Sequence, residues 1–145
     1  MKSLSKQRYS LAKLSVLSWS EKVLLVRVFA VLFAYKCLLL VVPFRTFLSS
    51  RSRIEAGEAL SEEKLRRVIW AIQVLSARLP LGFTCLVQAL SAKWLLKNHP
   101  TIRIYIGVQK TESQQFAAHA WIVYKDKTIL GEQLNQVFKP ILNWN

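Results

Sequence analysis

The spacing of apolar residues changes once along this chain, and that change limits the folds available to it. Before Asn98-His99-Pro100 the apolar residues recur at helical spacing, and after it they alternate with polar ones. Residues 101–108 show the alternation, with isoleucines separated by Arg103 and Tyr105. The sequence therefore predicts helices first and an antiparallel sheet afterwards, which is an α+β fold.

Two helices are predicted directly before the sheet. The first covers about residues 61–77 and begins at Ser61, an N-cap residue followed by two glutamates that the helix dipole favours. Pro80 and Gly82 then interrupt the helical pattern. The second helix covers about residues 84–98.

Three strands are predicted in the second half, at about residues 101–108, 116–124 and 127–134. Lys125-Asp126 lies between the last two and predicts a tight hairpin turn. The tail, residues 137–145, is apolar on both sides of a proline, and we expect it to dock on the body of the domain.

The first 58 residues differ in charge from the rest. Residues 1–53 hold ten Lys and Arg against one acid, whereas the remaining residues hold eleven against seven, for a net charge of +13. We expect residues 1–58 to form a basic, apolar helical region and residues 59–145 the main domain. The charge favours an anionic partner, such as a membrane surface or an acidic peptide, although a solvated basic face explains it equally well. The chain carries no nucleic-acid-binding signature, so we expect no nucleic-acid partner.

Residues 23–42 are apolar and long enough to cross a bilayer, and Pro43 ends them. Arg27 and Lys36 lie inside this stretch, and their insertion cost nearly cancels the gain from the apolar residues. The two charges point to opposite sides of a helix, so the stretch is not a simple amphipathic helix. We therefore favour a helix that is mostly buried, or that lies along a membrane surface, over one that spans it.

The chain has two cysteines and two histidines, which limits the sites they can build. Cys37 and Cys85 suggest no disulfide framework, and their spacing to His99 and His119 matches no metal motif. We expect no metal and no cofactor. Two thiols without a secretory signal fit the cytoplasm, with membrane association as an open addition.

Cys85 lies at the start of the second predicted helix, after Pro80 and Gly82. Free backbone N–H groups and the positive end of the dipole favour a thiolate there, and they can also stabilise an oxyanion. The alternative is a small buried apolar side chain, which is the expected role of Cys37 within its apolar helix.

His119 lies in the middle of the second predicted strand, between two alanines that leave space around its ring. If the turn has two residues, Tyr124 opposes Lys127 and Glu132 opposes His119. A carboxylate there can accept the imidazole N–H and fix its tautomer. Trp121 shares the face of His119, where it lines either a substrate groove or the core.

A thiol on a helix, an imidazole on a strand and a carboxylate on the next strand are typical of the papain-like and transglutaminase-like superfamily. Within it, residues 60–145 resemble the leader-peptidase half of the B proteins of lasso-peptide biosynthesis. The resemblance rests on Cys85-Leu86-x-x-Ala89-Leu90, Trp94-Leu95-Leu96, Ile104-x-Ile106-Gly107-Val108 and Ala118-His119-Ala120-Trp121.

This resemblance implies a cysteine protease that removes the leader from a ribosomal precursor peptide. It implies that a small separate recognition protein presents the leader and that an ATP-using cyclase then closes the ring. By position, Cys85 is the nucleophile, His119 the general base and Glu132 the orienting acid. The chain departs from the family at two positions, since the family usually has Asp where Glu132 stands and Pro where Val87 stands.

Two other functions use the same features. A transglutaminase-like acyltransferase would use the same residues but pass the acyl group to an amine rather than to water. A catalytically silent, membrane-associated adaptor of a peptide-maturation complex would rely on the basic N-terminal region alone.

Overall fold

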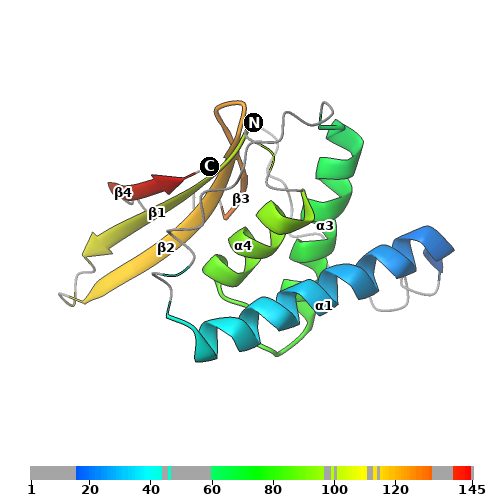
Figure 1. Cartoon of the computed structure of the whole chain (residues 1–145), viewed down its shortest axis with the longest axis horizontal. Helices are drawn as coiled ribbons and strands as arrows, with labels where there is room; N and C mark the ends of the chain where they lie inside the picture. The colour runs from blue at the N-terminus through cyan, green and yellow to red at the C-terminus, as the bar shows by residue number, and fades with distance from the viewer. Residues whose placement is uncertain are drawn as a thin grey trace.

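The computed structural model describes residues 16–43, 46, 60–96, 99, 101–110, 113, 115–131 and 139–144. Three helices precede the sheet in the described part: α1 (Trp19–Val41), α3 (Glu62–Arg78) and α4 (Cys85–Leu95). Four strands follow: β1 (Ile102–Lys110), β2 (Phe116–Tyr124), β3 (Lys127–Leu130) and β4 (Lys139–Trp144). Figure 1 shows the helices grouped beside the sheet, and α4 lies next to its strands. The mixed α+β class predicted from the sequence is confirmed.

The strands form one antiparallel sheet in the order β3-β2-β1-β4. β1 pairs with β2 along its whole length, from Ile102 opposite Tyr124 to Lys110 opposite Phe116. β4 pairs with the other side of β1, so the tail, which we expected only to dock, is the fourth strand. Proline is tolerated there because β4 is an edge strand.

The hairpin between β2 and β3 has the predicted two-residue turn. Lys125 and Asp126 have φ angles of 46° and 62°, and Tyr124 pairs with Lys127. Positive φ at both central residues is typical of a type I′ turn, whose twist matches that of the flanking strands.

A bulge in β3 changes the register after that turn. Pairing steps from Thr128 directly to Leu130, so Ile129 is an extra residue on this strand. The count that placed Glu132 opposite His119 assumed a regular ladder, and the bulge removes that basis. β3 also ends at Leu130, earlier than predicted, and Glu132 itself lies outside the described residues.

The core lies between the helices and one face of the sheet. Alternate residues of β1 and β2 point into it, whereas Arg103 on the other face is exposed. α1 belongs to the same core through three fully or nearly buried side chains. The largest fully buried side chains are Val28, Leu32, Ile72, Leu96, Ile102, Ile104 and Ile122.

We expected α1 to be mostly buried or to lie along a membrane surface, and the structure contradicts the first of these two alternatives. Only Leu25, Val28 and Leu32 are buried among its 23 residues, because α3 and α4 cover one side of the helix. By length and composition α1 could cross a membrane, although a core helix passes the same test. The boundary expected between residues 58 and 59 lies outside the described residues.

Candidate active site

The start of α4 is fixed by its N-cap residue, Thr84. The Thr84 backbone is extended, with φ −68° and ψ 161°, and its hydroxyl accepts a hydrogen bond from the Val87 N–H at 3.4 Å. Cys85 is therefore the first residue of the helix. The N–H groups of Cys85 and Leu86 have no acceptor within the helix, because they lie in its first turn.

The loop before Thr84 is anchored from two sides. The Phe83 side chain is buried, and the Gln88 side-chain amide donates to the Phe83 carbonyl at 2.9 Å. Gly82 has a φ of 59°, a conformation that glycine adopts without steric cost. These contacts hold the chain in a defined path up to Cys85.

The Cys85 side chain is half-buried, and β2 contacts its sulfur directly. The backbone N–H of Ala120 donates to the Cys85 Sγ at 3.4 Å. A thiolate accepts such a bond more strongly than a neutral thiol does, because the acceptor is charged. The contact holds the sulfur beside the residue that follows His119.

The sulfur lies beside β2 at a position that pairs with β1 but not with β3. β1 pairs with Ala120 through Ile106. The last pair between β2 and β3 is Ile122 with Leu130, which leaves Ala120 beyond the end of β3. The Cys85 sulfur occupies this position beside the backbone of β2.

His119 is held on the other face of β2. Its Nε2 lies 2.5 Å from the Gly131 carbonyl oxygen, so Nε2 carries the proton and Nδ1 is the basic nitrogen. The ring stacks on Trp121 with centroids 6.2 Å apart, and Trp121 stacks on Tyr105 at 5.8 Å. Gly107 lies opposite on β1 and adds no side chain beside the imidazole.

The backbone between His119 and Ala120 links the imidazole to the amide that binds the Cys85 sulfur. The buried side chain of Ala120 faces the helices. Neighbouring side chains of a strand point to opposite faces, so the His119 side chain leaves β2 on the other face. The amide that binds the Cys85 sulfur is bonded to the His119 carbonyl carbon. The Gly131 carbonyl holds the imidazole at this point of β2.

Gly131 is a site residue that the sequence reasoning missed. Its φ is 82°, and a Cβ there would lie 2.8 Å from the Ala120 carbonyl oxygen. Only glycine fits so close to β2, and this approach brings the Gly131 carbonyl to His119. An isolated glycine after a strand pattern suggests a close backbone approach, and that signal could have found it.

A comparison with protein families identifies the fold. The model of the transglutaminase-like superfamily matches residues 29–143, which is most of the chain. The chain belongs to the transglutaminase-like superfamily. This superfamily includes cysteine proteases and acyltransferases. Searches of curated proteins and of solved structures gave no significant match.

In this transglutaminase-like chain, three of the four predicted site residues lie in the described part. The Cys85 sulfur contacts the backbone of β2 at Ala120, the His119 ring contacts the Gly131 carbonyl, and Trp121 stacks on the imidazole. The position of Glu132 is not described. Cys37, expected to pack in the interior, is exposed on α1 because it lies on the side away from α3 and α4.

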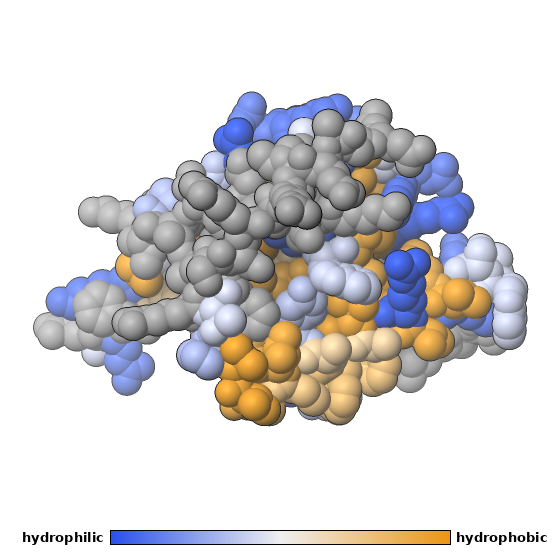
Figure 2. Space-filling view, viewed as in Figure 1, coloured by the Kyte–Doolittle hydropathy of each residue, from blue (hydrophilic) through white to orange (hydrophobic). Residues whose placement is uncertain are grey.

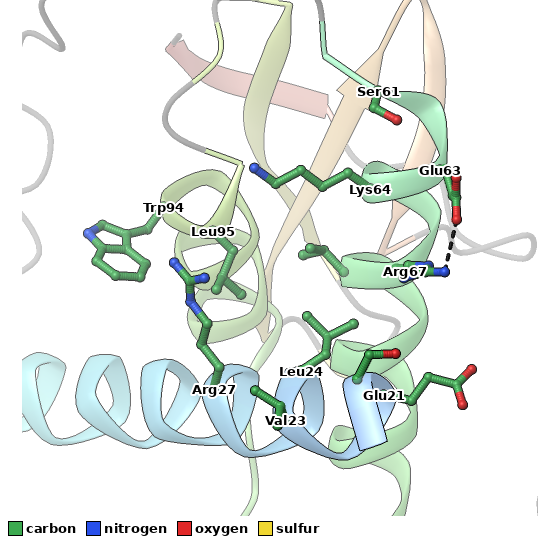
Figure 3. A pocket seen from close by; sticks show the side chains of 12 residues that line it. Glu21, Val23, Leu24, Arg27, Ser61, Glu63, Lys64, Arg67, Trp94 and Leu95 are labelled. Carbon is green, nitrogen blue, oxygen red and sulfur yellow. Dashed lines mark ion pairs between the residues drawn. The ribbon is translucent and has the colours of Figure 1, made fainter. Parts of the chain in front are cut away.

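Hollows lie on the described part of the transglutaminase-like domain, and two of them bear on where the site lies. One of about 390 Å³ adjoins the site and is lined by Gln88 and by β3 up to Gly131. The other, of about 1040 Å³, lies between α1, α3 and α4, where Arg27 and Lys64 extend toward the end of α4 (Figure 3). It contains neither Cys85 nor His119. Within the described ranges, no group of three His, Cys, Asp or Glu could hold a metal ion.

Proposed function

We propose that this chain is a cysteine peptidase that removes the leader from a ribosomally made lasso-peptide precursor. The observation that carries the proposal is the Cys85 sulfur at the start of α4, bonded by the amide that follows His119. Membership of a superfamily with cysteine proteases supports the reaction class. The resemblance of the segments around Cys85 and His119 to the lasso B proteins supports the substrate.

In this mechanism Nδ1 of His119 takes the proton of the Cys85 thiol, and the resulting thiolate attacks the carbonyl carbon of the scissile peptide bond. The backbone N–H groups of Cys85 and Leu86 stabilise the oxyanion that forms. As the C–N bond breaks, the leaving amine takes a proton from Nδ1 of His119, and a thioester remains. Water then attacks the thioester and gives a proton to Nδ1, and the sulfur leaves as a thiolate.

The Gly131 carbonyl keeps the His119 ring in the tautomer that this mechanism needs. We assign Glu132, the next residue, the role of stabilising the imidazolium form through its negative charge. Trp121 supports the ring by stacking and borders the groove for the substrate. Glu132→Gln tests the assignment, because it removes the charge and keeps the size of the side chain.

The substrate and partners belong to the same proposal. The leader region of the precursor is presented by a small recognition protein, and an ATP-dependent cyclase takes the product. The leader lies as an extended chain beside the edge strand β3, in the hollow bordered by Gln88 and Gly131. The reaction takes place in the cytoplasm.

The test combines the protein, a leader-recognition partner and a candidate precursor, and follows leader release by mass spectrometry. We expect release with the natural protein and none with Cys85→Ala. Cys37→Ala is the matched control, because it removes the other, exposed thiol and should leave release unchanged. Release by a folded Cys85→Ala protein would instead favour the silent adaptor.

Acyl transfer is the second candidate, because the superfamily also includes acyltransferases. Running the reaction in ¹⁸O-labelled water with an added primary amine separates the two. Hydrolysis places the label in the new leader carboxylate. Acyl transfer joins the leader to the amine without taking up label, and that product would overturn the peptidase assignment.

A further inference from the structure

α1 presents an apolar surface to the outside of the molecule. Trp19, Val26 and Leu40 are 80%, 69% and 80% exposed, although all three are large and apolar. They stand 7 and 14 residues apart, or about two and four helical turns, so they lie on one side of the helix. We call this side the outer stripe, and it comprises Trp19, Val23, Val26, Phe33, Cys37 and Leu40. A continuous apolar surface of this kind marks an interaction site.

The opposite side of α1 is fixed in the domain. Leu25, Val28 and Leu32 belong to the core shared with α3 and α4. The helix therefore lies along one edge of the domain (Figure 1). Its outer stripe is exposed, away from this core. Figure 2 shows apolar side chains gathered along the same lower edge of the molecule.

Arg27 and Lys36, the two charged residues within the apolar stretch, do not lie on the outer stripe. The Lys36 ammonium lies 5.8 Å from the centre of the Phe83 ring, so it faces the domain. Arg27 extends toward α4 at the flank of the stripe (Figure 3). Glu21, the one acid in α1, is bonded by the N-cap Ser18. Lys22 is exposed on the same side at the start of the helix, next to Trp19, and the rest of the outer stripe, from Val23 to Leu40, is free of charge.

We propose that the outer stripe docks on the surface of an anionic lipid bilayer, with α1 lying in the plane of the membrane. The apolar side chains enter the boundary between headgroups and acyl chains. The excess of Lys and Arg, ten against one acid in residues 1–53, attracts the lipid phosphates. This inference does not depend on the proposed peptidase activity.

Charge and packing favour this occupant over two others. A second copy of the chain would bring two bodies of net charge +13 together, and they would repel each other. A membrane-spanning α1 would have to withdraw Leu25, Val28 and Leu32 from the core. Docking flat on lipid keeps those contacts and covers the outer stripe.

Vesicle flotation with the full chain tests the proposal. We expect binding to phosphatidylcholine vesicles with about one third phosphatidylglycerol, and at least about tenfold weaker binding to pure phosphatidylcholine. Val26→Glu and Phe33→Glu should each weaken binding to the anionic vesicles about tenfold, since they place a charge in the apolar boundary. Ala77→Glu is the matched control: it adds the same charge at an exposed position of α3 and should bind like the natural chain.

A second measurement needs no charged variant. An environment-sensitive fluorophore on Cys37, in a Cys85→Ser background, reports on the centre of the outer stripe. We expect its emission to shift to shorter wavelength when anionic vesicles are added. No shift, or equal binding by Val26→Glu and the natural chain, would overturn the proposal.

Two further outcomes point to the other occupants. If light scattering shows a dimer that Phe33→Glu converts to a monomer, without binding to vesicles, the stripe is a contact between copies. If the protein stays in membranes after alkaline carbonate extraction, α1 spans the bilayer. Either result contradicts docking on the surface.

Discussion

The Ala120 backbone N–H and the Cys85 sulfur are 35 residues apart in sequence and 3.4 Å apart in space. This hydrogen bond fixes the start of α4 against the middle of β2. The Ala120 N–H has no partner in β3, because the last pair between β2 and β3 is Ile122 with Leu130. The same strand position carries His119, so one stretch of backbone serves both groups of the candidate site.

His119→Gln should slow the reaction of Cys85 with iodoacetamide. The variant keeps an amide near the Gly131 carbonyl but has no basic nitrogen to take the thiol proton. We expect alkylation at pH 7 to be about tenfold slower. The measurement is made in a Cys37→Ser background, so that one thiol is followed. An unchanged rate would show that His119 does not act on the sulfur.

Gly131→Ala should destabilise the fold and impair the site together. The φ of 82° costs about 1–3 kcal/mol for alanine, and the contact of 2.8 Å with the Ala120 carbonyl oxygen adds to it. Urea unfolding measures the loss, and the alkylation rate of Cys85 measures the site.

Gly82→Ala is the matched control for that comparison. Its φ is similar, 59°, but a Cβ there meets only the Lys36 ammonium at 3.8 Å, an ordinary contact. We expect a loss of about 1 kcal/mol, from backbone conformation alone. Equal losses for the two variants would contradict the close approach of Gly131 to β2.

Thr84→Ala tests the cap that places Cys85 in the first helical turn. Removing the hydroxyl leaves the Val87 N–H without its partner, and we expect a loss of about 1 kcal/mol. Thr84→Ser keeps the oxygen and should retain most of the stability. Thermal unfolding followed by circular dichroism separates the two, and equal losses would show that the methyl group matters rather than the cap.

The sequence predicted the elements of the site better than their register. The limits of β2 and the Lys125-Asp126 turn follow from alternation and turn chemistry, which are local properties. The bulge at Ile129 is not local, because it depends on how tightly Gly131 approaches the neighbouring strand. Regular counting therefore led to Glu132 and passed over the glycine before it.

In α1, too, the limits of the element could be predicted from local features and its packing could not. Length and Pro43 predicted α1 closely, but its apolar residues surround the helix, so periodicity could not reveal which side is buried. Only contacts with α3 and α4 separate Leu25 and Val28 from Val26. Strand β4 was missed because its proline argues against a strand when no partner is known.

Lys93→Met should make the protein more stable at neutral pH. Lys93 is only 4% exposed, and burial lowers the pKa of its ammonium to about 8 from 10.5. The unfolded chain therefore binds more protons than the folded one between pH 8 and 10.5, and the stability of the natural protein rises over that range. Below pH 8 both states are charged, and the cost of burying the ammonium is fully present.

We expect Lys93→Met to be about 1–2 kcal/mol more stable at pH 7, with partial solvation of the ammonium limiting the gain. The difference should shrink as the pH rises above 8, because the natural side chain then becomes neutral in the folded state. Urea unfolding of both proteins at several pH values measures this difference. Groups that titrate in both proteins contribute equally to the two free energies of unfolding and cancel in the difference. Lys64→Met is the control, since it removes an equal charge from an exposed position. A stability difference that stayed constant up to pH 10 would show that the gain comes from packing and not from the buried charge.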